Sequence, residues 1–269
     1  MSDLTFNDPS ILTPTVNNEI SVSRWKAAGI HFLLSVGVVS AILVGMLAVW
    51  YPQPYFSAMG GKNMLFILAA VDVVIGPLIT LIIFNPKKKS LKFDLAVIAI
   101  IQIAALGYGV YTLFQARPVY TVFVKNEFKV VSANDLDDEQ RSKVTRTEFK
   151  TLPVTGPTLV VADEPTNVAE QTMAQDARLY GMGLQNMPQS YIPYNERVTQ
   201  VLAQAQKLAV LQQRNPTGFK EIEDFLSQLS KKNEEVVFLP LNAKKQSMTV
   251  LIDAKSGAVI KILAVSPWR

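Results

Sequence analysis

Three long apolar runs within the first 114 residues of this 269-residue chain limit what it can fold into. They cover residues 27–50, 64–84 and 95–114. At about 1.5 Å of rise per residue, helices of this length measure about 30–36 Å, which is enough to cross a bilayer. The sequence therefore predicts a membrane protein that begins with a three-helix transmembrane bundle.

The charges in the loops predict how these helices are oriented. Arg24 and Lys26 precede the first run, and four lysines lie between the second and third runs, at positions 87, 88, 89 and 92. The other loop carries only Lys62. Short cytoplasmic loops carry the excess of Lys and Arg, so we expect a cytoplasmic N-terminus and a C-terminal part on the outer side of the membrane, which is the periplasm if the host is a Gram-negative bacterium. The basic pI comes from these flanking charges and does not indicate nucleic-acid binding.

Residues 118–269 have the composition of an ordinary soluble domain. Short apolar runs predict strands at 119–124, 128–131, 158–162, 236–241, 247–253 and 258–264, and helical patterns cover 134–147, 163–180, 195–214 and 217–230, the last capped by Thr217. Tight turns at 125–127 and 254–257 predict two hairpins. We therefore expect three parts: a disordered cytoplasmic tail at 1–23, the transmembrane region at 24–117, and a mixed α+β periplasmic domain with antiparallel strands at 118–269.

The residue types needed for most catalytic and metal chemistry are missing. The chain has no cysteine, and its single histidine, His31, lies in the first apolar run. A histidine-based triad and a His or Cys metal site therefore cannot be built in the C-terminal domain. No glycine-rich phosphate loop follows a strand there. We expect neither an enzyme nor a bound cofactor or metal.

Polar residues inside the second run share one helix face. Asp72, Gly76 and Thr80 recur every four residues, beside Pro77 as a kink site. A carboxylate about 12 Å deep is costly unless it is protonated or partnered. Ser40 and Tyr108 are predicted at a similar depth as hydrogen-bond partners. Asp72 is either a structural staple between helices or a contact for a partner helix or a proton-linked step.

Two other patterns suggest contacts. Gly37, Ala41 and Gly45 recur every four residues, which predicts a smooth ridge for close packing within the bundle. The irregular stretch 181–194 has the composition of an adaptable contact surface, although it could equally be a loop packed on its own core. The side chains of interest in this stretch are Met182, Met187, Tyr191 and Tyr194.

Several strings resemble one known family. They are SRWKAAGIHF at 23–32, VDVVIGPL at 71–78 with FNP at 84–86, QARPVY at 115–120 and YIPY at 191–194. Together with the layout of three helices and one domain, they resemble the type IV pilin accessory proteins of the TfpX/TfpZ type, which are also described as FimB-like. The resemblance implies a non-enzymatic, chaperone-like protein with its helices in the lipid of the bacterial inner membrane. Such a protein helps a cognate major pilin accumulate and assemble into pili, with other pilus assembly components as further candidate partners.

If the protein serves a pilin, the polar face of the second helix suggests a hypothesis for where the pilin would bind. The apolar pilin helix is expected on the face of Asp72, Gly76 and Thr80, with the pilin head held by the periplasmic domain and its loop at 181–194. Pilins carry an acidic residue near the cytoplasmic end of that helix, and His31 lies at a suitable depth to meet it. Two alternatives remain open: a membrane-anchored periplasmic ligand-binding or regulatory protein, and a transport-linked component that uses Asp72.

Overall fold

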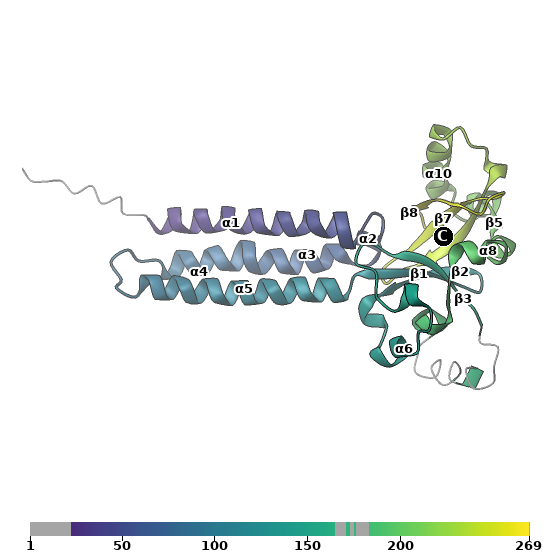
Figure 1. The fold of residues 1–269 in the computed structure, drawn as a ribbon. Coiled ribbons are helices and arrows are strands. Elements are labelled where there is room, and N and C mark those ends of the chain that lie inside the picture. The colour runs from purple at the N-terminus through teal and green to yellow at the C-terminus, as the bar shows by residue number, and fades with distance from the viewer. Residues whose placement is uncertain (1–22, 165–170, 173–174, 176–182, 269) are drawn as a thin grey trace, which may run out of the picture.

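The molecule consists of three long helical segments that lie side by side, with a β-sheet domain at one end (Figure 1). The computed structural model describes residues 23–164, 171–172, 175 and 183–268. The tail predicted at 1–23 therefore lies almost entirely outside the described residues, as does most of the helix predicted at 163–180.

Each apolar run forms one continuous helical segment, which confirms the three predicted helices. The first joins α1 to a π-helical stretch, the second joins α3 and α4 through another π-helical stretch, and the third is α5. Their bounds are Arg24–Gly45 for α1 and Met46–Trp50 for its π-helical end; Gly61–Ala69 for α3, Ala70–Ile75 for the π-helical stretch and Gly76–Ile83 for α4; and Leu91–Gln115 for α5. All three are long and apolar enough to cross a membrane. We call them together the three-helix bundle.

The irregularity expected at Pro77 lies just before this residue. In a regular α-helix, the proline ring would meet the carbonyl group of Val73, and no N–H group would be there to bond it. The helix instead widens into the π-helical stretch Ala70–Ile75, which contains Asp72. π-Helical turns of this kind are rare and are frequent at functional sites.

The C-terminal domain contains one eight-stranded mixed sheet. Its strand order is β4-β3-β1-β2-β6-β7-β8, and β5 also pairs with β6. The strands are β1 Pro118–Val124, β2 Glu127–Ser132, β3 Thr158–Ala162, β4 Tyr191–Pro193, β5 Gln206–Lys207, β6 Val236–Asn242, β7 Ser247–Asp253 and β8 Val259–Leu263. Both predicted hairpins are confirmed, β1–β2 and β7–β8.

The expectation of purely antiparallel strands is wrong for two pairs. β1 pairs with β3 in parallel, and β2 pairs with β6 in parallel. In both cases a long connection separates the two strands, so no tight turn fixes them as antiparallel neighbours. The connection can then return the chain to the starting edge, which places the next strand parallel to the earlier one.

Among the described residues, the helices of this domain are shorter and more broken than predicted. They are α6 Asp138–Ser142, α8 Val198–Gln204, α9 Leu208–Arg214 and α10 Pro216–Gln228, with short 3-10 turns at Ala133–Asp135 and Thr147–Phe149. The continuous helix predicted at 134–147 is wrong, because Leu136 is extended and Asp137 caps a new helix at the backbone N–H of Gln140. The cap of α10 is Asn215 rather than Thr217, since the Asn215 side chain accepts from the Gly218 N–H at 2.9 Å.

The helix predicted at 195–214 is interrupted by β5. Gln206 and Lys207 pair with β6 and separate α8 from α9. Val201 of α8 packs into the core near the bundle, whereas Leu208 and Leu211 of α9 pack into a second core with α10. The break lets the two halves turn their apolar faces toward different cores.

The bundle and the sheet share one hydrophobic core at their junction. Residues 51–59, which we call the junction segment, include the helix α2 (Tyr55–Ala58) and connect the first and second helices. Their side chains pack in a single cluster with Met46 of the first helix, Leu113 of α5 and Leu239 of β6. Apolar burial therefore joins the two parts directly, without a solvated linker between them.

Hydrogen bonds reinforce the junction. The hydroxyl group of Tyr51 donates to the Leu113 carbonyl oxygen at 2.8 Å, and the hydroxyl groups of Tyr55 and Thr121 lie 2.9 Å apart. The Gly156 N–H also donates to the carbonyl oxygen of Val49 at 2.8 Å. The bonds of Tyr55 and Gly156 therefore connect the sheet domain to the helical part, and the bond of Tyr51 connects the junction segment to α5.

We predict that Phe56→Ala destabilises the protein by weakening the core that joins the bundle to the sheet domain. Phe56 is buried against Gly61, where even one added methyl group would lie 2.4 Å from the ring. Removing this ring should lower the free energy of unfolding by about 3–5 kcal/mol. The measurement is thermal or denaturant unfolding in detergent. Phe66→Ala is the control, because Phe66 is 74% exposed on the bundle surface. Equal effects of the two substitutions would contradict the proposed role of the junction.

Candidate functional site: a buried polar cluster and an apolar groove

A polar cluster lies inside the bundle where all three helices meet. Nδ1 of His31 on α1 and Oγ1 of Thr80 on α4 lie 2.7 Å apart and share a hydrogen bond. Thr80 is buried. This hydrogen bond between side chains of two neighbouring helices fixes the rotation of α1 against α4.

Gly76 makes room for the cluster. A Cβ atom at this position would lie 1.8 Å from Nε2 of Gln102 on α5 and 3.2 Å from Nε2 of His31. Gly76 and Thr80 therefore face the interior of the bundle, between side chains of the two neighbouring helices. The spacing in the sequence predicted that Gly76 and Thr80 share one helix face with Asp72, and in the structure all three residues are buried in the bundle.

Asp72 lies one turn before Gly76 and is only 6% exposed. Within the described residues, its carboxylate has neither a hydrogen bond nor an ion pair. The expected partners are wrong: Ser40 is exposed, and Tyr108 is 73% exposed. Neither forms a hydrogen bond with Asp72. Counting residues along the helices predicts how deep Ser40 and Tyr108 lie, but it does not predict that their side chains point away from Asp72.

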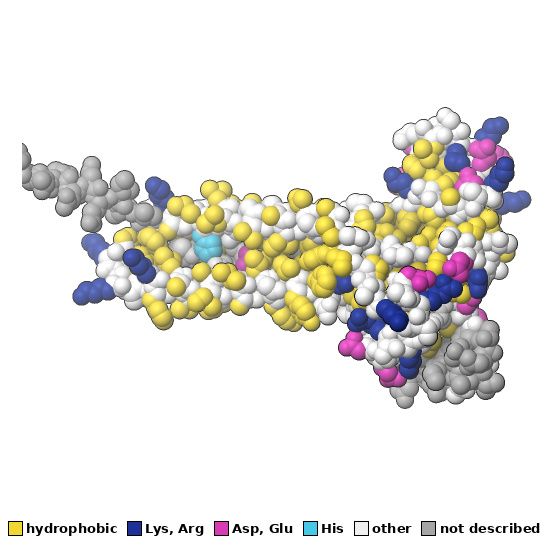
Figure 2. All heavy atoms as spheres, viewed as in Figure 1, with side chains coloured by type: hydrophobic (Ala, Val, Ile, Leu, Met, Phe, Trp, Pro, Cys, Tyr) yellow, Lys and Arg dark blue, Asp and Glu magenta, His cyan; other side chains and the backbone are white. Residues whose placement is uncertain are grey.

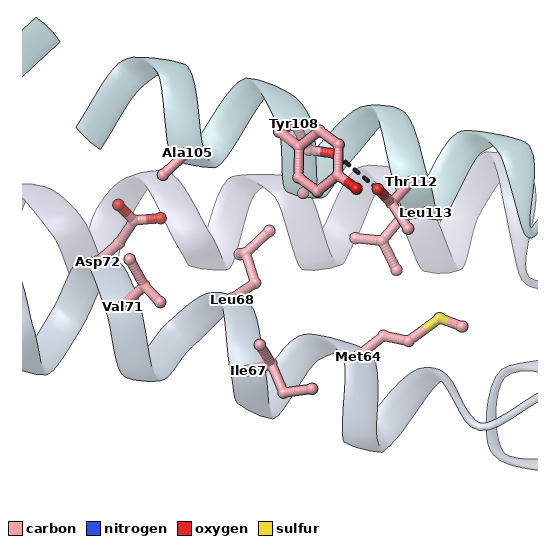
Figure 3. A pocket seen from close by; sticks show the side chains of 10 residues that line it. Met64, Ile67, Leu68, Val71, Asp72, Ala105, Tyr108, Thr112 and Leu113 are labelled. Carbon is pink, nitrogen blue, oxygen red and sulfur yellow. Dashed lines mark hydrogen bonds between the residues drawn. The ribbon is translucent and has the colours of Figure 1, made fainter. Parts of the chain in front are cut away.

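An apolar groove between α3 and α5 opens beside this carboxylate. Figure 3 shows Asp72 at one end, with its carboxylate pointing across the groove toward Ala105. The groove has a volume of about 320 Å³ and extends toward the junction. Its walls are formed by Met64, Ile67, Leu68, Val71, Asp72, Ala105, Tyr108, Gly109, Thr112 and Leu113. The Thr112 hydroxyl group is satisfied, because it donates to the Tyr108 carbonyl oxygen at 2.9 Å. We call this feature the Asp72 groove.

The predicted small-residue ridge of the first helix does not pack inside the bundle. Gly37, Ala41 and Gly45 are exposed, and a Cβ atom added at either glycine would meet nothing within 4 Å. The buried face of this helix instead includes Ala28 and Val39. These two residues lie on the opposite side of the helix at 100° per residue, so the ridge prediction is wrong for the packing of this chain.

The predicted contact residues of the 181–194 stretch are mostly packed inward. Met187 and Tyr191 are buried, and the Tyr191 ring packs edge to face on Tyr120 at 5.0 Å. Tyr194 donates to the Gly257 carbonyl oxygen at 2.7 Å, and burial raises the pKa of its hydroxyl group to about 12. Met182 lies outside the described residues. Met187, Tyr191 and Tyr194 therefore agree with the alternative expectation for this stretch, that of a loop packed on its own core.

Within the described residues, no group of three or more His, Cys, Asp or Glu side chains is arranged to hold a metal ion. The residues that sequence reasoning missed are the apolar walls of the Asp72 groove, such as Ile67 and Val71. Their identity gives no signal, because most residues of a transmembrane helix are apolar whether they face lipid, a neighbouring helix or a groove.

We predict that Gly76→Ala destabilises the bundle and that Gln102→Ala suppresses the effect. The new methyl group overlaps the Gln102 amide, which should cost about 1–3 kcal/mol, and shortening Gln102 removes the overlap. Unfolding in detergent of the single and double variants measures the coupling. Gly107→Ala is the matched control, because a Cβ atom there meets nothing within 4 Å. If the double variant is no more stable than Gly76→Ala alone, the proposed packing is wrong.

Comparisons with known proteins identify the family. The model of the fimbrial assembly protein FimB matches residues 21–60, which contain His31 and the whole junction segment. Fimbrial assembly proteins of Dichelobacter nodosus from serogroups I and E1 are 32% and 31% identical, and each match covers 84% of this chain and 90% of the relative. That of serogroups C1 and C2 is 42% identical over 41% of this chain and 86% of its own length. No solved structure matches. The chain therefore belongs to the FimB family of fimbrial assembly proteins.

Proposed function

We propose that this protein is an inner-membrane accessory protein that stabilises a cognate type IV major pilin and promotes its assembly into pili. Membership of a fimbrial assembly family supports a role in pilus assembly. The more specific role as a chaperone-like partner of the pilin rests on the architecture described above. That architecture offers one surface to the lipid and another to the aqueous phase.

The surface of the bundle supports its placement in the membrane. Figure 2 shows hydrophobic side chains along the visible face of the bundle and basic side chains at the end far from the sheet. Large apolar residues such as Leu33, Ile82 and Ile103 are at least 69% exposed, which would be unfavourable in water. The lysine-rich loop between α4 and α5 favours the cytoplasmic side for that end, and hence the periplasm for the sheet domain.

The observation that carries the proposal is the shared core at the junction. A pilus subunit with an apolar helix and a soluble head presents two surfaces, one in the membrane and one outside it. Because residues 51–59 join the bundle to the sheet, this protein holds its own two surfaces in a fixed relation. Two weak contacts to the same subunit then add through effective concentration.

His31 fits a second part of the proposal. It is half-buried, and Figure 2 shows its ring at the surface of a hollow in the bundle. Nδ1 is bonded to Thr80, whereas Nε2 has no hydrogen bond to any described residue. We propose that Nε2 can donate to an acidic side chain of the pilin helix. A pilin that packs there would face Gly76 only after Gln102 moved, since Gln102 fills that position.

The test of this function is co-purification of the major pilin with the tagged full-length protein from piliated cells in a gentle detergent. We expect the pilin in the eluate, and fewer pili in a strain that lacks this protein. Absence of pilin from the eluate together with normal piliation would discard the accessory role and favour a ligand-binding or regulatory one.

A separate prediction concerns His31. Replacing it with alanine should reduce pilus number at normal levels of the variant protein, because the Nε2 donor is lost. Thr80→Val is the matched control, since it removes only the internal hydrogen bond to Nδ1. Electron microscopy counts pili, and an immunoblot monitors the protein. If His31→Ala leaves piliation unchanged, or if Thr80→Val causes the same loss, the pairing proposal is wrong.

A further inference from the structure

Asp72 is the feature of the bundle that internal packing does not explain. The other polar residues nearby have partners or clear packing roles: His31 bonds Thr80, and Gln102 fills the space beside Gly76. Asp72 is more than nine-tenths buried and has no hydrogen bond or ion pair to any described residue. Its carboxylate points into the Asp72 groove (Figure 3).

A carboxylate in this setting is costly unless it is protonated or another group compensates it. A buried acceptor whose capacity is unused within its own chain can be satisfied by a donor that arrives from outside. The low dielectric of the surroundings would make such a pair strong and specific, because little solvent screens it. The chemistry of the site therefore selects a partner with a hydrogen-bond donor or a positive charge inside the membrane.

We propose that the Asp72 groove is a docking site for a transmembrane helix of a pilus subunit, and that Asp72 recognises a hydrogen-bond donor or cationic group on that helix. The identity of the partner rests on the proposed function. The apolar walls bind the body of the helix, and the carboxylate sets its depth and rotation.

The dimensions of the groove fit this occupant. Its walls run from residues 72 to 64 on one side and from 105 to 113 on the other. At about 1.5 Å per residue each wall is about 12 Å long, which corresponds to two turns of a docked helix. The small side chain of Ala105 faces Asp72, so a neighbouring backbone can approach there. The far end of the groove reaches the junction, where the docked helix would emerge beside the sheet domain.

A lipid chain is a poorer occupant on the same grounds. An acyl chain could cover the apolar walls, but it has no donor for the carboxylate and would leave Asp72 uncompensated. The test must nevertheless distinguish a helix from lipid, since both are present at this surface.

The experiment places a photoreactive phenylalanine analogue at Ile67 of the full-length protein in membranes of piliated cells. Ile67 lines the groove and is 65% exposed. Leu34 on α1 is the matched control, because it is equally exposed at 65% and does not line the groove. We expect an adduct that reacts with antibody to the major pilin at position 67, at least tenfold stronger than at position 34. Equal adducts at both positions, or only lipid adducts at position 67, would overturn the docking site.

Two substitutions then test the carboxylate itself. Asp72→Leu should reduce the adduct at position 67 at least tenfold, because the acceptor is lost. Leucine is less costly than aspartate in this setting, so the variant should still accumulate, as an immunoblot can verify. Asp72→Asn keeps an acceptor oxygen and should retain part of the adduct. An undiminished adduct with Asp72→Leu would overturn the role of Asp72.

The result is separable from the proposed function. If the pilin co-purifies with the wild-type protein but no adduct forms in the groove, the docking site is wrong and the accessory function stands. If the pilin neither co-purifies nor depends on this protein for piliation, the proposed function itself is wrong.

Discussion

The burial of residues 51–59 between the helix ends and the sheet is the interaction on which the rest of the molecule depends. The segment could have been a solvated loop at a membrane surface, and it is instead the centre of a shared core. Because Tyr51 bonds α5 and Tyr55 bonds β1, the loop fixes the bundle and the sheet in one arrangement. A protein built this way can offer a membrane surface and an aqueous surface to the same partner.

The residues that interrupt the apolar composition of the bundle have two different roles. Nδ1 of His31 and the Thr80 hydroxyl group share a hydrogen bond, and position 76 requires a glycine because the Gln102 amide occupies the space that a side chain would need. These residues hold the helices in register. Asp72 does not, since its carboxylate has no internal partner among the described residues and lies beside an open apolar groove. Among the described residues of the bundle, the Asp72 carboxylate is therefore available to a partner from outside, and so is Nε2 of His31, which makes no hydrogen bond.

The sequence predicted the features that depend on composition and local pattern. Long apolar runs determine helices in any context, and the tight turn around Lys125–Glu127 with its flanking strands determines a hairpin. It did not predict features set by distant partners. Gly37 and Gly45 resemble a packing ridge but face outward, and Tyr191 resembles a contact residue but packs on Tyr120. Likewise, the parallel pairing of β1 with β3 depends on a crossover that no local pattern encodes.

We propose that this protein protects the major pilin in the membrane, and the half-life of the pilin is the most direct test. A pulse–chase experiment compares this half-life between cells with and without the protein and after complementation. We expect faster loss of the pilin in cells without the protein and recovery with the wild-type protein. An unchanged half-life in its absence would show that the protein does not stabilise the pilin, whatever the pilin is found to bind.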